Sequence, residues 1–329
     1  MRSAPITLDR FVLEQQRSSP GSAGELSLLL VRLGVAAKRI ANALASAGLT
    51  GAHGPAGSAN VQGEEQKKLD VVANDILLEA FDYGGLVTLA ASEEMEQPHV
   101  YDASLAQGRY AVLFDPMDGS SNIDVNGTLG TIFSIRRRRD GTANDLLRAG
   151  HEQVAAGYFL FGPAVLLVYS SGDGVHLFTL DPAIGEFLLT RPRVAMPERG
   201  KAYAVNEGRA HAWAPGVRAF VEKLKTPDPA TGRAYATRYS ASLVADVHRF
   251  LLEGGIYLYP ADAAAGSGKL RVLYECHPLA FVIEQAGGRA STGTGRVLDV
   301  VPATLHERMP LAIGSRSEVE LFDTYAARA

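Results

Sequence analysis

The chain has 329 residues, of which 47% are hydrophobic and 21% are charged, and its net charge at pH 7 is −4. This composition is typical of a globular protein of about two domains. The weakly negative charge favours neither nucleic acid nor an anionic membrane as a partner. A single cysteine, Cys276, excludes an intrachain disulfide and a cysteine-based zinc site. Charged residues interrupt the apolar ones in residues 1–17, which is unlike a signal peptide, and no apolar run is long enough to span a membrane. We therefore expect a cytoplasmic protein.

Apolar residues recur at helical spacing near the start of the chain. Between Leu26 and Ala47 they predict one long helix, with Gly48 as its C-cap. The small residues of 51–60 predict a mobile loop. The charged run that begins at Glu64 predicts the start of a second helix, which we expect to continue to about Phe81.

The pattern changes to that of strands from residue 86 onward. The runs that predict strands are 86–91, 110–114, 131–135, 155–161, 165–170, 175–180 and 187–190. Prolines within 191–197 mark a boundary, so we expect a larger N-terminal lobe at 1–195 and a smaller C-terminal lobe at 196–329. In the second lobe, helices are expected at 216–224, 242–253 and 278–287, and strands at 255–259 and 268–274. The sequence therefore predicts a layered α/β protein.

Carboxylates follow two of the expected strands. Glu93 and Glu94 come after the strand at 86–91, and Asp115 and Asp118 come directly after the strand at 110–114. If these strands are neighbours, the carboxylates meet at one end of a sheet, which is costly unless cations neutralise them. Hard divalent ions with oxygen ligands are the natural solution. The pattern therefore indicates a metal site.

The turn after Asp118 suits a bound anion. Residues 119–121 read Gly-Ser-Ser, and such a turn can direct backbone N–H groups at a phosphate. Metal on one side and amides on the other is what phosphoryl transfer requires. Acidic residues after strands are often only solvated loops or helix caps, which is the favoured reading for Glu93-Glu94 taken alone. The spacing of Asp115, Asp118 and Asp124 does not fit a calcium-binding EF-hand loop.

The acidic segment has a recognisable form. Residues 115–121 with Glu93-Glu94 resemble the lithium-sensitive phosphatase superfamily, which includes inositol monophosphatase, and the extended run FDPMDGSSNID at 114–124 resembles class I fructose-1,6-bisphosphatase. Further matching runs are KKLD at 67–70, AAGY at 155–158, LDPAIGEF at 180–187, VNEG at 205–208, VADVHR at 244–249, GIYLYP at 255–260 and KLRVLYEC at 269–276. The resemblance implies an αβαβα sandwich that hydrolyses the 1-phosphate of fructose 1,6-bisphosphate with a metal-activated water.

The resemblance also implies roles for individual residues. The implied ligands of about two or three Mg²⁺ ions, with Mn²⁺ as a substitute, are Glu93, Asp115, Asp118, Glu275, the Met117 carbonyl and, for a further ion, Glu64. Asp70 and Glu94 would activate the water. The 1-phosphate would contact Asp118, Gly119, Ser120 and Ser121. The 6-phosphate would contact Asn206, Tyr239, Tyr257, Tyr259 and Lys269, and Arg238 would reach the site of a neighbouring subunit in a homotetramer. Arg209 stands where animal members of the family carry a tyrosine.

A second set of residues matches the family's site for AMP. The set is Gly24, Glu25, Leu26, Ser27, Arg109, Tyr110 and Arg137. Ala23 lacks the hydroxyl of the family pattern, so we expect weakened AMP inhibition. The run of arginines at 136–139 is expected to be a solvated strand end.

Other functions stay open at this point. A sedoheptulose-1,7-bisphosphatase or a bifunctional enzyme is the main alternative, because residues for a distal phosphate do not determine the length of the sugar. A non-catalytic sugar-phosphate-binding regulator is the second alternative, although it would have no need to keep every implied catalytic carboxylate.

Overall fold

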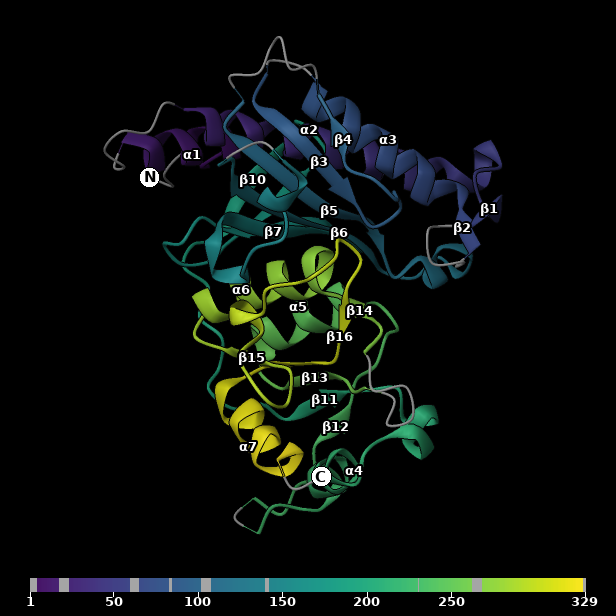
Figure 1. Ribbon diagram of the computed structural model, residues 1–329, viewed down its shortest axis with the longest axis vertical. Helices are drawn as coiled ribbons and strands as arrows, with labels where there is room; N and C mark the ends of the chain where they lie inside the picture. The colour runs from purple at the N-terminus through teal and green to yellow at the C-terminus, as the bar shows by residue number, and fades with distance from the viewer. Residues whose placement is uncertain are drawn as a thin grey trace.

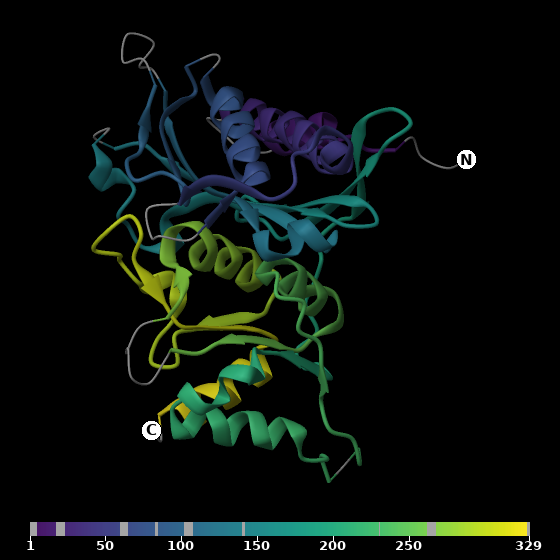
Figure 2. The same ribbon diagram turned by 90° about the vertical axis from the view of Figure 1, so that its right-hand side faces the viewer.

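Helices and sheets alternate in five layers along the long axis of the molecule (Figures 1 and 2). The computed structural model describes residues 5–17, 24–59, 65–82, 85–101, 108–139, 142–229, 231–261 and 268–327, and the structural statements below concern these. The predicted αβαβα sandwich is confirmed. The helices are α1 (Leu8–Arg17), α2 (Glu25–Thr50), α3 (Lys68–Asp82), α4 (Pro215–Lys225), α5 (Leu243–Glu253), α6 (His277–Gln285) and α7 (Arg316–Ala326). None of the described helices is both long and apolar enough to cross a bilayer.

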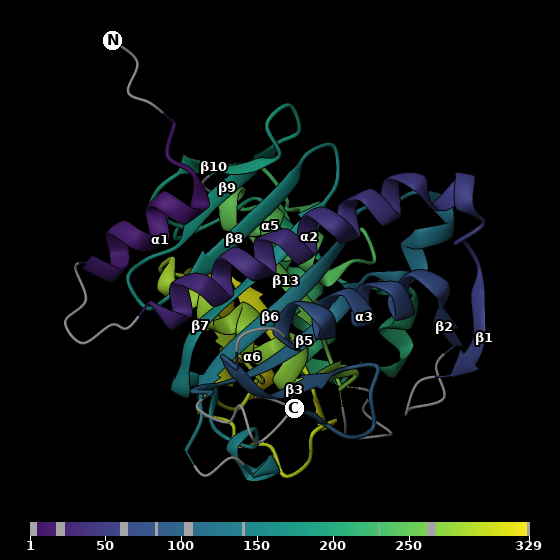
Figure 3. The same ribbon diagram turned by 90° about the horizontal axis from the view of Figure 1, so that it is seen from above.

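The N-terminal sheet has eight strands in the order β10-β9-β8-β7-β6-β5-β3-β4. Their bounds are β3 (Val87–Ser92), β4 (His99–Val100), β5 (Tyr110–Asp118), β6 (Leu129–Arg137), β7 (Gln153–Phe161), β8 (Val165–Ser170), β9 (His176–Asp181) and β10 (Glu186–Arg191). Helices α1 to α3 cover its outer face (Figure 3). The long helix α2 packs there because Leu29, Leu33 and Ile40 form an apolar stripe.

The C-terminal sheet has five strands in the order β12-β11-β13-β17-β15, beside a small β14-β16 pair. Their bounds are β11 (Ala202–Ala204), β12 (Ala236–Thr237), β13 (Ile256–Tyr259), β14 (Leu270–Arg271), β15 (Arg289–Ser291), β16 (Arg308–Met309) and β17 (Leu311–Gly314). Helices α5 and α6 fill the space between the two sheets (Figure 2). One apolar cluster contains Ile132 of β6, Val244 of α5 and Ile313 of β17, so the two lobes share a core.

Several predicted boundaries are wrong. Helix α2 continues past Gly48 to Thr50, and the cap is Gly51 with φ 69°. The predicted loop at 51–60 contains strand β1 (Pro55–Ala59), which pairs with β2 (Glu65–Lys67), so α3 begins at Lys68 and not at Glu64. A charged run suits a helix start or an exposed edge strand equally, and only the pairing partner decides between them.

The predicted strand at 268–274 is also wrong. Only Leu270–Arg271 form a strand, and Val272–Cys276 (η6) make a single π-helical turn that leads into α6. All five residues of this turn are buried, so they show no polar face by which a sequence pattern could distinguish a turn from a strand. Such turns are rare and often lie at functional sites.

Candidate active site

Strands β3 and β5 bring the predicted carboxylates together. The two strands are parallel neighbours, with Ser92 opposite Phe114, as the prediction of a shared sheet end requires. The backbone N–H of Glu93 donates to the carbonyl oxygen of Phe114 at 3.1 Å. The turn after Ser92 therefore places Glu93 beside Asp115, the residue of β5 that follows Phe114.

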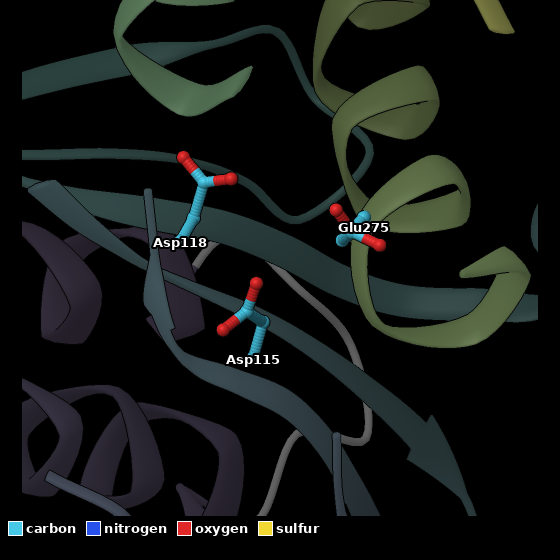
Figure 4. A group of neighbouring side chains, drawn as sticks. All are labelled: Asp115, Asp118 and Glu275. Atoms are coloured by element: carbon cyan, nitrogen blue, oxygen red, sulfur yellow. The ribbon is translucent and has the colours of Figure 1, made fainter. Parts of the chain in front are cut away.

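The centre of the site is a triad of buried carboxylates (Figure 4). One oxygen from each of Asp115, Asp118 and Glu275 lies within 4.8 Å of the others. Their exposed fractions are only 4%, 6% and 6%. Asp115 and Asp118 come from β5 in the N-terminal lobe, whereas Glu275 comes from the π-helical turn η6 in the C-terminal lobe. The triad therefore exists only where the two lobes meet.

Each carboxylate of the triad is oriented by donors from the chain. Asp115 accepts from the backbone N–H of Met117 at 2.9 Å. Asp118 accepts from the Ser242 hydroxyl and the Val244 N–H, both at 2.8 Å, at the N-terminus of α5. Helix N-termini stabilise negative charge. Glu275 accepts from the backbone N–H of Arg271 at 2.6 Å. These bonds leave oxygen lone pairs available for a cation.

Arg271 is a site residue to which the sequence analysis assigned no role. Its guanidinium lies 2.8 Å from the carboxylate of Glu93, and the pair is nearly fully buried. The local sequence concealed it, because a basic residue inside an apolar run reads as an exposed strand position. The sequence offered no signal for this role, because Glu93, the partner of Arg271, lies far away in the chain.

The predicted water-activating pair lies at the edge of the triad. Asp70, in the first turn of α3, accepts from the Lys67 N–H at 2.8 Å, which is one half of a capping box. Its other oxygen is buried and has no hydrogen-bond partner among the described residues. Glu94 accepts from the side chain of Gln66 at 2.7 Å. Both carboxylates line the cavity that holds the triad.

Crowding of these acids penalises their charged forms. Burial, followed by repulsion from Glu93, raises the pKa of Asp115 and of Glu275 well above the usual range. Burial raises the pKa of Asp118 to about 6, although its hydrogen bonds at α5 oppose the shift. Burial, with added repulsion from Glu94 and Glu93, raises the pKa of Asp70 to about 7. A cation bound among these oxygens would remove the penalty, so the residues present fit a hard divalent metal.

The predicted phosphate-binding turn follows Asp118 directly. Gly119 has φ 80°, a left-handed conformation, and caps the 3₁₀ turn η2 (Ser120–Val125). A β-carbon on this glycine would lie 2.8 Å from that of Ser242, the residue that donates to Asp118. Glycine therefore lets the turn pass close to α5 and leaves Ser120 and Ser121 lining the cavity.

One cavity of about 430 Å³ joins the triad to the predicted 6-phosphate end. Its far end is lined by Asn206, Tyr239, Tyr257, Tyr259 and Lys269, together with Arg209. Arg209 and Lys269 also line a smaller hollow of about 50 Å³ at this end. Burial, followed by the nearby Tyr239 and Asp118, raises the pKa of Tyr257, so its phenol stays neutral. Positive charge thus lies at one end of the cavity and negative charge at the other.

Two predicted residues fall outside this cavity. Arg238 is exposed, donates to the Thr237 carbonyl at 2.8 Å and does not line it, and its role toward a neighbouring subunit stays a prediction. Glu64 lies outside the described residues.

Comparison with known proteins identifies the family. Two family models match the chain: "Fructose-1-6-bisphosphatase, N-terminal domain" over residues 6–192 and "Fructose-1-6-bisphosphatase, C-terminal domain" over residues 196–327. The chain belongs to the fructose-1,6-bisphosphatase family. The resemblance drawn from the motifs is thereby confirmed.

Relatives of this fructose-1,6-bisphosphatase family member match it along nearly the whole chain. "Fructose-1,6-bisphosphatase class 1" of Thermosynechococcus vestitus is 48% identical and covers 97% of this chain and 92% of its own length. The protein of the same name from Chlorobium luteolum is 48% identical and covers 97% of both. The fold is similar to Leishmania major fructose-1,6-bisphosphatase in holo form, with TM-score 0.92 and 38% identity over 98% of this chain and 99% of that one. The apo form of that protein has TM-score 0.87.

The residues matching the AMP site of the fructose-1,6-bisphosphatase family gather on the outer face of the sheet. Leu26, Ser27, Tyr110 and Arg137 line a cavity of about 520 Å³. The Arg137 guanidinium lies 5.9 Å from the centre of the Tyr110 ring, within cation–π range. Gly24 and Glu25 line a neighbouring hollow, and Glu25 pairs with Arg109 at 3.3 Å. Ala23 lies outside the described residues, and AMP binding stays a prediction.

The raised pKa of Asp70 predicts a pH-dependent stability in metal-free protein. Because its folded pKa of about 7 exceeds the unfolded value of 3.8, the stability that its proton contributes is complete below pH 4. That stability is lost as the pH rises toward 7. Asp70→Asn does not titrate, so its free energy of unfolding should rise relative to wild type between pH 4 and pH 7. Urea unfolding in chelator, at several pH values, measures the difference.

The comparison of two variants has an internal control. Buried neutral histidines such as His248, whose pKa burial lowers to about 4, have the opposite slope but contribute equally to both proteins. A difference that stayed constant across this pH range would contradict the prediction.

Proposed function

We propose that the protein hydrolyses the 1-phosphate of D-fructose 1,6-bisphosphate to give fructose 6-phosphate and phosphate. The observation that carries the proposal is the single cavity with two unlike ends. A buried carboxylate triad lies beside a glycine-serine turn at one end, and Arg209 and Lys269 lie at the other. Such a cavity suits a substrate with a phosphate at each end. Family membership supports the same reaction.

We propose Mg²⁺ as the natural metal, with Mn²⁺ as a substitute. Asp115, Asp118, Glu275 and Glu93 would hold it, because buried carboxylate oxygens are the ligands that hard cations prefer. Arg271 pairs with Glu93, so this carboxylate is not buried without a partner. The metal would supply positive charge against the phosphate oxygens and acidify the attacking water.

The remaining steps are assigned to groups of the chain. Asp70 and Glu94 would accept the proton of the attacking water, and the buried, unpartnered oxygen of Asp70 supports this role. The 1-phosphate would be held over the turn at residues 119–121. Asn206 and the tyrosines would bind the distal phosphate together with Lys269. Residues 1–195 would thus carry the 1-phosphate and most of the metal ligands, and residues 196–329 would carry the sugar and the 6-phosphate and supply Glu275 to the metal.

A direct assay tests the reaction. Purified protein with Mg²⁺ should release phosphate from fructose 1,6-bisphosphate, lose the activity in chelator and regain it with Mn²⁺. Glu275→Gln should lower kcat/KM by about 10²-fold or more, because it removes one of the negative charges that would hold the metal. Glu284→Gln is the matched control, since Glu284 lies on α6, pairs with Arg296 and does not line the cavity.

The same assay separates the alternatives. Faster release from sedoheptulose 1,7-bisphosphate would make the protein the sister phosphatase. Binding of either sugar without release of phosphate would instead support a regulator.

The positive end of the cavity predicts a selective effect on substrate affinity. Arg209→Ala should raise KM for fructose 1,6-bisphosphate by about ten-fold, because one charge-assisted hydrogen bond to the distal phosphate is lost. Its KM for a monophosphate ester that lacks the distal group should not change. Arg218→Ala, an exposed arginine on α4 outside the cavity, is the control. An equal rise for both substrates would contradict this assignment.

We also propose AMP as an inhibitor and a homotetramer as the assembled form. The cavity that contains Tyr110 and Arg137 supports a phosphate-bearing ligand, and the missing hydroxyl at Ala23 supports weak binding. Titration of activity with AMP should show inhibition that Arg137→Ala abolishes. Inhibition that survives this change would contradict the predicted site.

The single, buried cysteine supports a cytoplasmic location.

A further inference from the structure

Arg136 is buried where the sequence predicts a solvated strand end. Its side chain is 0% exposed, although its neighbour Arg137 is exposed. Among the residues that the structure describes, no carboxylate lies within ion-pair distance of it. Burial lowers its pKa to about 9, so it remains a cation at neutral pH. Burying an arginine without an anionic partner is costly, and the contacts that it makes must compensate.

The guanidinium of Arg136 connects β6 to the segment at 148–149 and to the side chain of His277. One terminal nitrogen donates to the carbonyl oxygens of Arg148 and Ala149 at 2.9 and 3.1 Å. The other donates to Nδ1 of His277 at 3.1 Å. Arginine only donates, so Nδ1 accepts and the ring proton lies on Nε2.

The side chain of Gln153 also binds His277, the first residue of α6. Gln153 of β7 lies opposite Arg136 in the sheet and donates to the carbonyl oxygens of Gly150 and His277 at 2.7 and 3.0 Å. Gly150 packs so closely that a β-carbon there would lie 2.8 Å from Cδ2 of the His277 ring. The first residue of α6 is therefore fixed to the N-terminal sheet through its ring and through its backbone.

This contact bears on the carboxylate triad through the chain itself. Glu275 lies two residues before His277, at the end of the π-helical turn. Asp115 on β5 pairs with Ile132 on β6, and Arg136 lies four residues further along β6. Alternation places Ile132 and Arg136 on the same face of the sheet, about 13 Å apart. One strand therefore sets both the position of Asp115 and the position of the helix that follows Glu275.

We propose that Arg136, with His277 as its acceptor, is a positioning residue that holds Glu275 beside Asp115 and Asp118, where the three carboxylates would bind the metal. The proposal rests on the metal site of the proposed function. Loss of the contact would let the π-helical turn shift relative to β5. The metal would then be bound more weakly, whereas the sugar end of the cavity would be unchanged.

A titration with Mn²⁺, in which the EPR signal of the free ion measures binding, tests this role. Arg136→Met keeps the volume but removes the donors, and it should weaken Mn²⁺ binding by about ten-fold. His277→Leu should do the same. His277→Asn should restore tighter binding, because its side-chain oxygen can accept from Arg136. KM for the sugar bisphosphate at saturating Mn²⁺ should stay at the wild-type value in all of these variants.

Arg148→Met is the matched control. Arg148 is also largely buried, and it donates to the Arg137 carbonyl oxygen on β6. It pairs with Glu152, however, and does not contact His277. This variant should lose thermal stability and retain Mn²⁺ affinity. Wild-type affinity in folded His277→Leu, or an equal loss in Arg148→Met, would overturn the positioning role. If Arg136→Met does not fold, the His277 pair decides the outcome. Absence of Mn²⁺ binding by the wild-type chain would overturn the metal site and this proposal with it.

Discussion

Repulsion among carboxylates buried where the two lobes meet is the constraint on which the rest of this structure depends. Asp115, Asp118, Glu93 and Glu275 are all nearly buried, and their charges oppose one another. The chain limits the cost with donors from its own backbone, with the N-terminus of α5 and with one guanidinium. What remains is an energetic demand for a cation, and that demand supports the proposed metal site.

The shared core between the sheets makes this arrangement stable. Helices α5 and α6 lie between the two sheets, and each contributes to the site at one end (Figures 1 and 2). Helix α5 presents its N-terminus to Asp118, and α6 follows directly after Glu275. Apolar burial between the lobes therefore supplies the free energy that holds like charges together. The lobes cannot separate without taking the triad apart.

Strand β6 directs side chains to both faces of the N-terminal sheet. Its alternate residues Ile132 and Arg136 face the inner helices, whereas Arg137 points to the cavity on the outer face. Adjacent arginines therefore have opposite environments, one fully buried and one in solvent. The pleat of a strand produces this division without any difference in residue type.

Much of the fold and of the site could be read from the sequence. The layers, most strands and the turn at 119–121 are confirmed, because periodicity and contiguous motifs are local properties of the chain, whereas β5 extends through Asp118 and contains the acidic residues predicted to follow it. The sequence indicated that Glu93 and Asp115 meet if β3 and β5 are neighbours, and the structure shows that these strands pair.

Only the tertiary structure decided what became of residues whose partners lie far away in the chain. From the sequence alone, Arg136 and Arg271 both resemble surface charges. In the structure Arg136 donates to His277, and Arg271 pairs with Glu93. The run at 272–276 reads as a strand, yet it is a π-helical turn enclosed by both lobes. A charge is buried or exposed according to what surrounds it, and for these residues the surroundings form only when the lobes pack. The sequence by itself predicted which carboxylates gather in the site, and the packing of the two lobes decided how they are held.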